Sequence, residues 1–128
     1  MKKIIGALIS LSALALSACG SSSFTTQKAA DFAQTISNPA VVVIDVRTPS
    51  EFAAGHIANA VNIDVEGGMF EQQIASLDKS KTYAVYCHSG RRSANAAGIM
   101  SKAGFTTIYN LDGGVTAWTA AGEQLVTR

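Results

Sequence analysis

From about residue 25 onward, short apolar runs alternate with segments whose apolar residues recur at helical spacing. Residues 40–44 form a continuous and mostly β-branched run, as expected of a strand buried on both faces. A second apolar run spans residues 82–86. Strands that alternate with helices predict an α/β domain with a largely parallel central sheet flanked by helices.

The remaining boundaries follow from local signals along the chain. Thr48-Pro49-Ser50-Glu51 is a capping box with proline at the first helical position, so a short helix is predicted to begin there. Gly104 is predicted to end the helix at residues 93–103. Further helices are predicted at 26–36, 69–77, 93–103 and 115–120, and short strands at 60–63 and 106–109. We see one domain and no internal repeat.

Residues 1–18 have the pattern of an export signal. Lys2 and Lys3 supply a positive start, and residues 4–18 carry no charge. As a helix this run of 15 residues is about 22 Å long, whereas the hydrocarbon layer of a bilayer is roughly 30 Å thick. We therefore interpret residues 1–18 as a signal peptide rather than a transmembrane span.

The end of this signal, Leu16-Ser17-Ala18-Cys19, resembles the lipobox of bacterial lipoproteins. The resemblance implies cleavage before Cys19, lipidation of its thiol, and a flexible tether over residues 19–24. The protein would then be exported and lipid-anchored to a bacterial membrane, on the periplasmic side or at the cell surface. The alternative is ordinary cleavage after Ala13-Leu14-Ala15, which would leave Cys19 incidental.

Removing 18 of the 128 residues leaves 110, which is enough for one domain with a core of its own. The remaining chain has 8 basic and 9 acidic side chains and no basic run, so no nucleic-acid surface is expected. If Cys19 carries lipid, Cys87 is the only thiol left, and an unpaired cysteine in an oxidising compartment points to chemistry. Cys87, His56 and His88 are too few ligands for structural zinc, and we expect neither a metal nor another cofactor.

The segment after the second apolar strand combines a nucleophile with an anion-binding loop. Cys87 follows the strand directly, at the end where open α/β sheets place their ligands. The amino terminus of the following helix and the nearby arginines favour a thiolate, and Gly90 lets the main-chain amides point inward. Cys87 is thus the candidate nucleophile, and the candidate substrate-binding residues are His88, Ser89, Gly90, Arg91, Arg92 and Ser93.

The pattern Cys-x-x-Gly-x-Arg-Ser at residues 87–93 resembles the active-site loop of rhodanese-like domains. Residues 43–47, 51–52 and 55–62 resemble the amino-terminal signature of that family, and residues 111–114 with Trp118 resemble its carboxy-terminal signature. The resemblance implies a three-layer rhodanese domain over residues 25–124. Trp118 is expected in the core.

Membership of this family would imply a sulfurtransferase. The loop cysteine would take the outer sulfur of a donor such as thiosulfate as a persulfide, and would pass it to a thiol, cyanide or protein acceptor. The loop from Cys87 to Arg92 has six residues, which in rhodaneses goes with sulfur substrates, whereas related phosphatases have one residue more. A persulfide carrier for one partner protein, or a redox-sensing binding module, are alternatives that the sequence leaves open.

Other charged residues near the loop have more than one interpretation. Arg91 is the preferred candidate for attracting the donor, and Arg92 could brace the loop against a carboxylate such as Asp45. Asp45 is also expected to join a structural ion network near the site. The other residues expected to be structural near the site are Arg47, Glu51 and His56. His88 is either a solvent-facing loop residue or an acid–base group.

Overall fold

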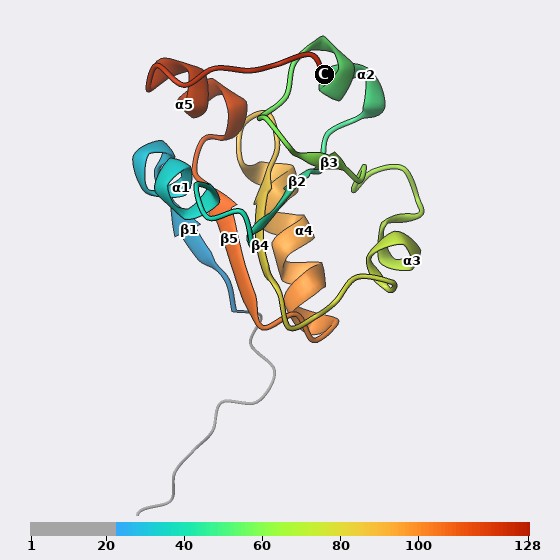
Figure 1. Ribbon diagram of the computed structural model, residues 1–128. Helices are drawn as coiled ribbons and strands as arrows, with labels where there is room; N and C mark the ends of the chain where they lie inside the picture. Colours follow the sequence, from blue (N-terminus) through green and yellow to red (C-terminus); the bar gives the residue numbers. More distant parts are fainter. Residues whose placement is uncertain (1–22) are drawn as a thin grey trace, which may run out of the picture.

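A parallel sheet forms the middle layer of the protein, which we describe from a computed structural model over residues 23–128 (Figure 1). All the strand pairs are parallel, in the order β1-β5-β4-β2-β3. The strands are β1 Thr25–Gln27, β2 Val42–Asp45, β3 Val61–Asn62, β4 Thr82–Tyr86 and β5 Thr107–Leu111. The predicted α/β class with a largely parallel sheet is confirmed.

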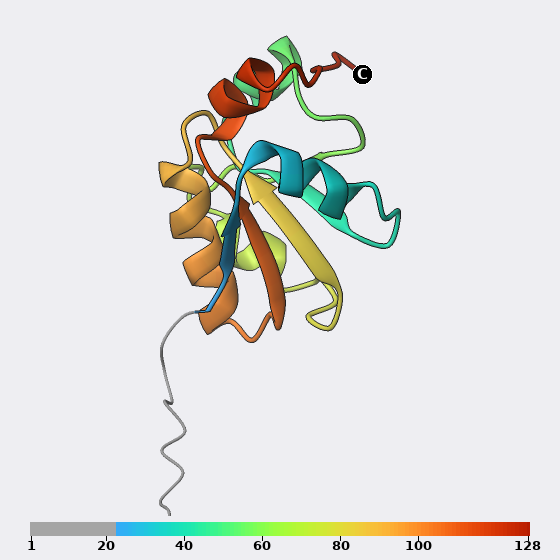
Figure 2. The same ribbon diagram turned by 90° about the vertical axis from the view of Figure 1, so that its left-hand side faces the viewer.

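Helices cover both faces of this sheet, as Figure 2 shows for α4 and α1. The helices are α1 Ala29–Ile36, α2 Pro49–Ala54, α3 Phe70–Ile74, α4 Arg91–Lys102 and α5 Gly114–Ala120. Side chains of α3 and α4 pack in one apolar cluster, and side chains of α1 and α5 pack in a second cluster. Trp118 lies in the second cluster, edge-on to Phe32, so its predicted place in the core is confirmed.

Strand β4 lies between β2 and β5 and is the strand that leads into the candidate loop. Its side chains alternate between the two cores: Tyr83 and Val85 pack with α3 and α4, and Ala84 and Tyr86 pack on the other face. Because β4 is buried on both faces, its sequence is apolar without interruption. This continuity is why the prediction for 82–86 agrees with the observed bounds.

Most predicted elements differ from the structure by a few residues at their ends, and the helix predicted at 69–77 spans only Phe70–Ile74. Two of the differences have a clear physical cause. The helix predicted from residue 26 begins only at Ala29, because residues 25–27 form the edge strand β1, which pairs with β5. Two of its three residues are exposed, so β1 lacks the apolar pattern that marks a strand. Helix α4 begins at Arg91 rather than at residue 93, since Gly90 adopts φ +103° and ends the loop immediately before it.

The packed unit also continues beyond residue 124. Val126 pairs with His56 in an isolated antiparallel bridge, and Leu125 packs on the core beside α5. Within residues 23–128, no helix is long and apolar enough to cross a bilayer. The predicted signal peptide, Cys19 and the tether up to residue 22 lie outside the described residues.

Candidate active site

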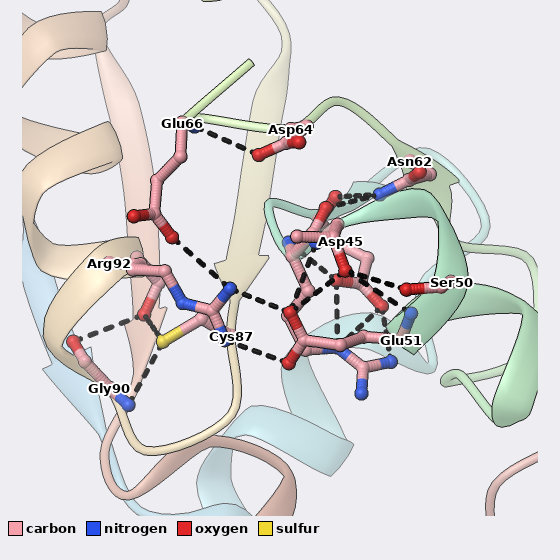
Figure 3. A network of polar contacts seen from close by, with 12 residues as sticks. Asp45, Ser50, Glu51, Asn62, Asp64, Glu66, Cys87, Gly90 and Arg92 are labelled. Carbon is pink, nitrogen blue, oxygen red and sulfur yellow. Dashed lines mark hydrogen bonds and ion pairs between the residues drawn. The ribbon is translucent and has the colours of Figure 1, made fainter.

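Cys87 lies at the carboxyl edge of the sheet, at the end of β4 and before the first turn of α4 (Figure 3). Its side chain is fully buried. The sulfur accepts a hydrogen bond of 3.0 Å from the main-chain N–H of Gly90 and one of 3.3 Å from the Ser93 hydroxyl. The thiol is therefore buried and accepts hydrogen bonds from two groups of its own loop and helix.

These donors decide how easily Cys87 ionises. Burial alone would raise the pKa of the thiol, since a charge is disfavoured where water is absent. The Ser93 hydroxyl and the main-chain N–H groups of Ser93, Gly90 and Ser89 outweigh burial, so the pKa of Cys87 lies below its ordinary value. The site thus favours a buried thiolate, and it offers the same donors to any anion bonded to the sulfur.

Helix α5 supports the loop through main-chain hydrogen bonds. The N–H of Val115 donates to the Cys87 carbonyl at 2.9 Å, and the N–H of Thr116 donates to the His88 carbonyl at 3.2 Å. Gly114 has φ +55°, and a Cβ at this position would overlap both carbonyl groups. The Gly113-Gly114 turn therefore packs directly against the main chain of the candidate loop. The sequence alone did not reveal this contact.

Arg92 is held by carboxylates from two other segments. Its guanidinium donates to both oxygens of Glu51, at 2.8 and 2.9 Å, and contacts Glu66 at 3.4 Å. The suggested partner Asp45 is incorrect, because that carboxylate is engaged by Arg47 at 2.7 Å instead. Arg92 consequently braces α4 against α2 and against the segment that precedes α3.

This arrangement also holds the charges of the pair in place. The hydrogen bond from Arg92 lowers the pKa of Glu51 from 4.5 to about 2, against an opposing effect of burial. The same contact raises the pKa of Arg92, and the nearby Cys87 sulfur adds to this increase. Much of the positive charge of Arg92 is therefore offset by carboxylates before any substrate binds.

The remaining loop residues face solvent. His88, Ser89 and Arg91 are exposed, and within residues 23–128 no carboxylate forms an ion pair with Arg91. A cleft of about 440 Å³ opens beside them. It is lined by Val65, Glu66, Ser89, Arg91, Arg92 and Asn95. Arg91 thus retains a positive charge on this cleft, four residues after Cys87, without an ion-pair partner among the described residues.

Asp45 and Arg47 form a buried pair behind the site. Two hydrogen bonds of 3.0 and 2.7 Å join the guanidinium to the two carboxylate oxygens. Arg47 also donates to the carbonyl of Gly55 at 2.6 Å and lies over the ring of Tyr86. This pair links the end of β2 to the end of α2, the helix that carries Glu51.

His56 makes contacts away from the sulfur. Its ring stacks on Phe52 with centroids 3.8 Å apart, and its two nitrogens lie 2.9 and 3.0 Å from main-chain oxygens of Phe52 and Arg128. His56 therefore connects α2 to the carboxy-terminal segment. Within residues 23–128, no group of three or more histidine, cysteine, aspartate and glutamate side chains is placed to hold a metal ion.

Comparison with known proteins identifies chains that are similar to this one in sequence and in fold. The family described as Rhodanese-like domain matches residues 28–121. A thiosulfate sulfurtransferase, GlpE, of Pseudoalteromonas translucida is 33% identical over 91 residues, covering 69% of this chain and 82% of that protein. A sulfurtransferase of Allochromatium vinosum is 31% identical over 86 residues, covering 67% and 78%. The crystal structure of a rhodanese-related protein from Thermoplasma volcanium superposes with a TM-score of 0.72 at 33% identity, covering 82% of this chain and all of that one.

Proposed function

This chain belongs to the rhodanese-like family, and we propose that it is a sulfurtransferase that carries sulfane sulfur as a persulfide on Cys87. The observation that carries the proposal is the environment of the sulfur. Cys87 is buried, yet the donors of Gly90 and Ser93 lower its pKa. A thiolate that is stabilised by preformed donors is a nucleophile ready to attack a sulfur donor.

The proposed first step uses thiosulfate. The Cys87 thiolate attacks the outer sulfur, the sulfur–sulfur bond of the donor breaks, and sulfite leaves with the bonding electron pair. The product is a persulfide anion on Cys87, which the amides of the loop can continue to stabilise. In the second step an acceptor thiolate or cyanide attacks the outer sulfur, and Cys87 is released as a thiolate.

We assign Arg91 to the attraction of the donor. Thiosulfate is a dianion, and Arg91 is exposed at the cleft without an ion-pair partner in the described chain. Arg92 is engaged by Glu51, so we assign it to holding α4 and the loop in position. The preference for thiosulfate is supported by relatives that are named thiosulfate sulfurtransferases.

We further propose that the protein acts outside the cytoplasm, anchored through lipid on Cys19. The support is the uncharged run at 4–18, the lipobox-like residues that end it, and the Ser21-Ser22-Ser23 linker. A thiol acceptor would then be a small molecule or a protein thiol of that compartment.

The deciding experiment is to incubate the purified protein with thiosulfate and to measure its mass. The wild type should gain one sulfur atom, which a reducing thiol removes, and Cys87→Ser should gain none. Steady-state transfer to cyanide and to several thiols is measured in parallel. If Cys87 takes up sulfur but does not transfer it to any small acceptor, the protein is a persulfide carrier and not an enzyme of small-molecule transfer. If no donor gives a sulfur adduct and the protein hydrolyses a phosphate ester, the sulfurtransferase proposal is wrong and the protein is a phosphatase.

A further inference from the structure

The described chain begins at the end of the domain opposite Cys87. The main-chain N–H of Ser23 donates to the hydroxyl of Ser101, in the last turn of α4, at 2.8 Å. Because all strands are parallel, the segments that enter them lie at one edge of the sheet and Cys87 lies at the other. Figures 1 and 2 show the chain entering the domain beside the end of α4, far from the loop before that helix.

Three lysines gather at this same edge. Lys79 and Lys81 are exposed in the turn that leads into β4, and Lys102 is exposed in the last turn of α4. Lys79 and Lys102 line one common pocket with Phe105, and the main-chain oxygen of Lys79 accepts from Thr106. We call Lys79, Lys81 and Lys102 the lysine edge.

The acidic residues nearby cancel only part of this charge. Asp78 lies in the same turn, and its carboxylate accepts hydrogen bonds from the N–H and hydroxyl of Ser80, at 2.9 and 2.6 Å. These bonds and the charge of Lys81 lower the pKa of Asp78, so it carries a full negative charge. Glu71 lines the pocket that Lys79 and Lys102 share. Three positive charges thus face two negative ones at this edge. The arginines Arg47, Arg91 and Arg92 all lie toward the other edge, around Cys87.

The length of chain before Ser23 limits how far the domain can stand from an anchor. Cys19 precedes Ser23 by four residues. Even fully extended, four residues span at most about 14 Å. A lipid on Cys19 would therefore bring the bilayer surface close to the end of α4, within reach of long lysine side chains.

We propose that the lysine edge rests on anionic phospholipid headgroups and orients the domain with Cys87 facing away from the membrane. This inference rests on the proposed lipidation of Cys19. A short tether alone would let the domain tilt in many directions, whereas lysines near an anionic surface favour one direction. The attraction between lysines and headgroups acts over about one Debye length, roughly 8–10 Å at physiological salt. A tether of at most about 14 Å keeps the lysine edge near that range. Cys87 would then meet acceptors that are dissolved in the compartment rather than embedded in the bilayer.

The test is amine labelling of the lipidated full-length protein in vesicles. The protein is reconstituted with phosphatidylcholine alone or with added phosphatidylglycerol, treated with an acylating reagent, and analysed by mass spectrometry of its peptides. Lys79, Lys81 and Lys102 should label about fivefold more slowly on the anionic vesicles. Lys28, which follows β1 at the opposite edge, should label equally on both and serves as the internal control.

A matched pair of variants tests whether the lysine edge itself causes the protection. The double variant Lys81→Glu and Lys102→Glu should restore fast labelling of Lys79 on anionic vesicles, whereas Lys28→Glu should leave Lys79 protected. High salt should remove the protection in the wild type.

The outcomes distinguish this inference from the proposals beneath it. Lipidated protein that sediments with the vesicles but labels equally on both compositions would overturn the orientation alone. Protein that carries no lipid mass and stays in the supernatant would overturn the anchoring, and the orientation with it. Charging of Cys87 by thiosulfate is measured separately and is unaffected by either result.

Discussion

Arg92 and Glu51 meet in two parallel hydrogen bonds of 2.8 and 2.9 Å, which join the first turn of α4 to the first turn of α2. Glu51 is at the same time the third residue of α2 and the carboxylate of its capping box, where it accepts from the main-chain N–H of Thr48. One carboxylate therefore caps the start of α2 and holds Arg92, five residues after the candidate nucleophile. The position of the loop thus depends on a residue 36 positions before Cys87.

Glu51→Gln should destabilise the domain at neutral pH by about 1 kcal/mol, because the pair is only partly buried. The pKa of Glu51 is lowered from 4.5 to about 2 in the folded protein. Its contribution is therefore fully present above pH 4.5 and is lost as the pH falls toward 2. Urea unfolding of both proteins at a series of pH values should show the difference closing over this range. Glu123→Gln, the same change at an exposed residue, is the control, and a gap that stays constant in acid would contradict the argument.

Ser93→Ala should raise the pKa of Cys87, since the Ser93 hydroxyl is the foremost donor that stabilises its thiolate. The rate of alkylation by iodoacetamide near neutral pH should fall about fivefold, with the lower thiolate fraction partly offset by higher intrinsic nucleophilicity. Ser89→Ala is the matched control, because Ser89 acts through its main-chain N–H. Equal alkylation profiles for Ser93→Ala and the wild type would show that the hydroxyl does not act on the thiol.

Gly114→Ala should disrupt the support of the loop, because the added Cβ would overlap the carbonyls of Cys87 and His88. We expect a loss of about 3 kcal/mol in the free energy of unfolding and a marked loss of sulfur charging. Gly122→Ala is the control, since φ there is +85° but nothing lies within 4 Å of the new Cβ. It should cost only the strain of the backbone, about 1 kcal/mol. If the two variants lose similar amounts of unfolding free energy, the overlap of the Gly114 Cβ with the loop is not the cause.

Arg91→Ala should slow charging by thiosulfate by about threefold to tenfold at low salt, because the proposed role of Arg91 is electrostatic attraction. The effect should shrink at high salt, where screening already weakens the attraction in the wild type. Lys81→Ala removes a positive charge at the far edge of the sheet and should leave the rate unchanged. A loss for Arg91→Ala that persists at high salt would instead indicate a direct contact with the reacting groups.

Cys19→Ser should move the protein from the membrane fraction to the soluble fraction after cell lysis. Charging of Cys87 should be retained, since lipidation is proposed to act on location only. Fractionation followed by the thiosulfate mass assay measures both properties. Recovery of the variant in the membrane pellet would argue against anchoring through Cys19.

The best-predicted part of the chain is the unit from β4 to α4. Residues 82–86 form a continuous apolar run and a helix follows the loop, so local patterns suffice to locate Cys87, although they placed the start of α4 two residues too late. The capping box at Thr48 was also predicted and is confirmed. Strand β1 was missed because an exposed edge strand of three residues has no distinctive pattern and forms only by pairing with β5.

The partners of the site residues were less accessible to prediction. Asp45, Glu51 and Glu66 are all carboxylates in segments that converge on the carboxyl edge of the sheet, and nothing local indicates which of them meets Arg92. The choice is made when α2 and the segment before α3 pack against α4. Glu66 had no sequence signal, since it lies in the loop before Gly67-Gly68, where no periodic pattern indicates which way a side chain points.

The sequence by itself determined that a cysteine follows a buried strand and precedes a helix, because strand burial and helix starts are encoded in neighbouring residues. The sequence also indicated a thiolate at Cys87, but only the tertiary structure decided which groups stabilise it. Its lowered pKa depends on how the loop folds back on the sulfur, and its position depends on the N–H groups of α5, 28 residues along the chain from Cys87 to Val115. Such distant contacts arise from the packing of whole helices, which no local pattern of residues specifies.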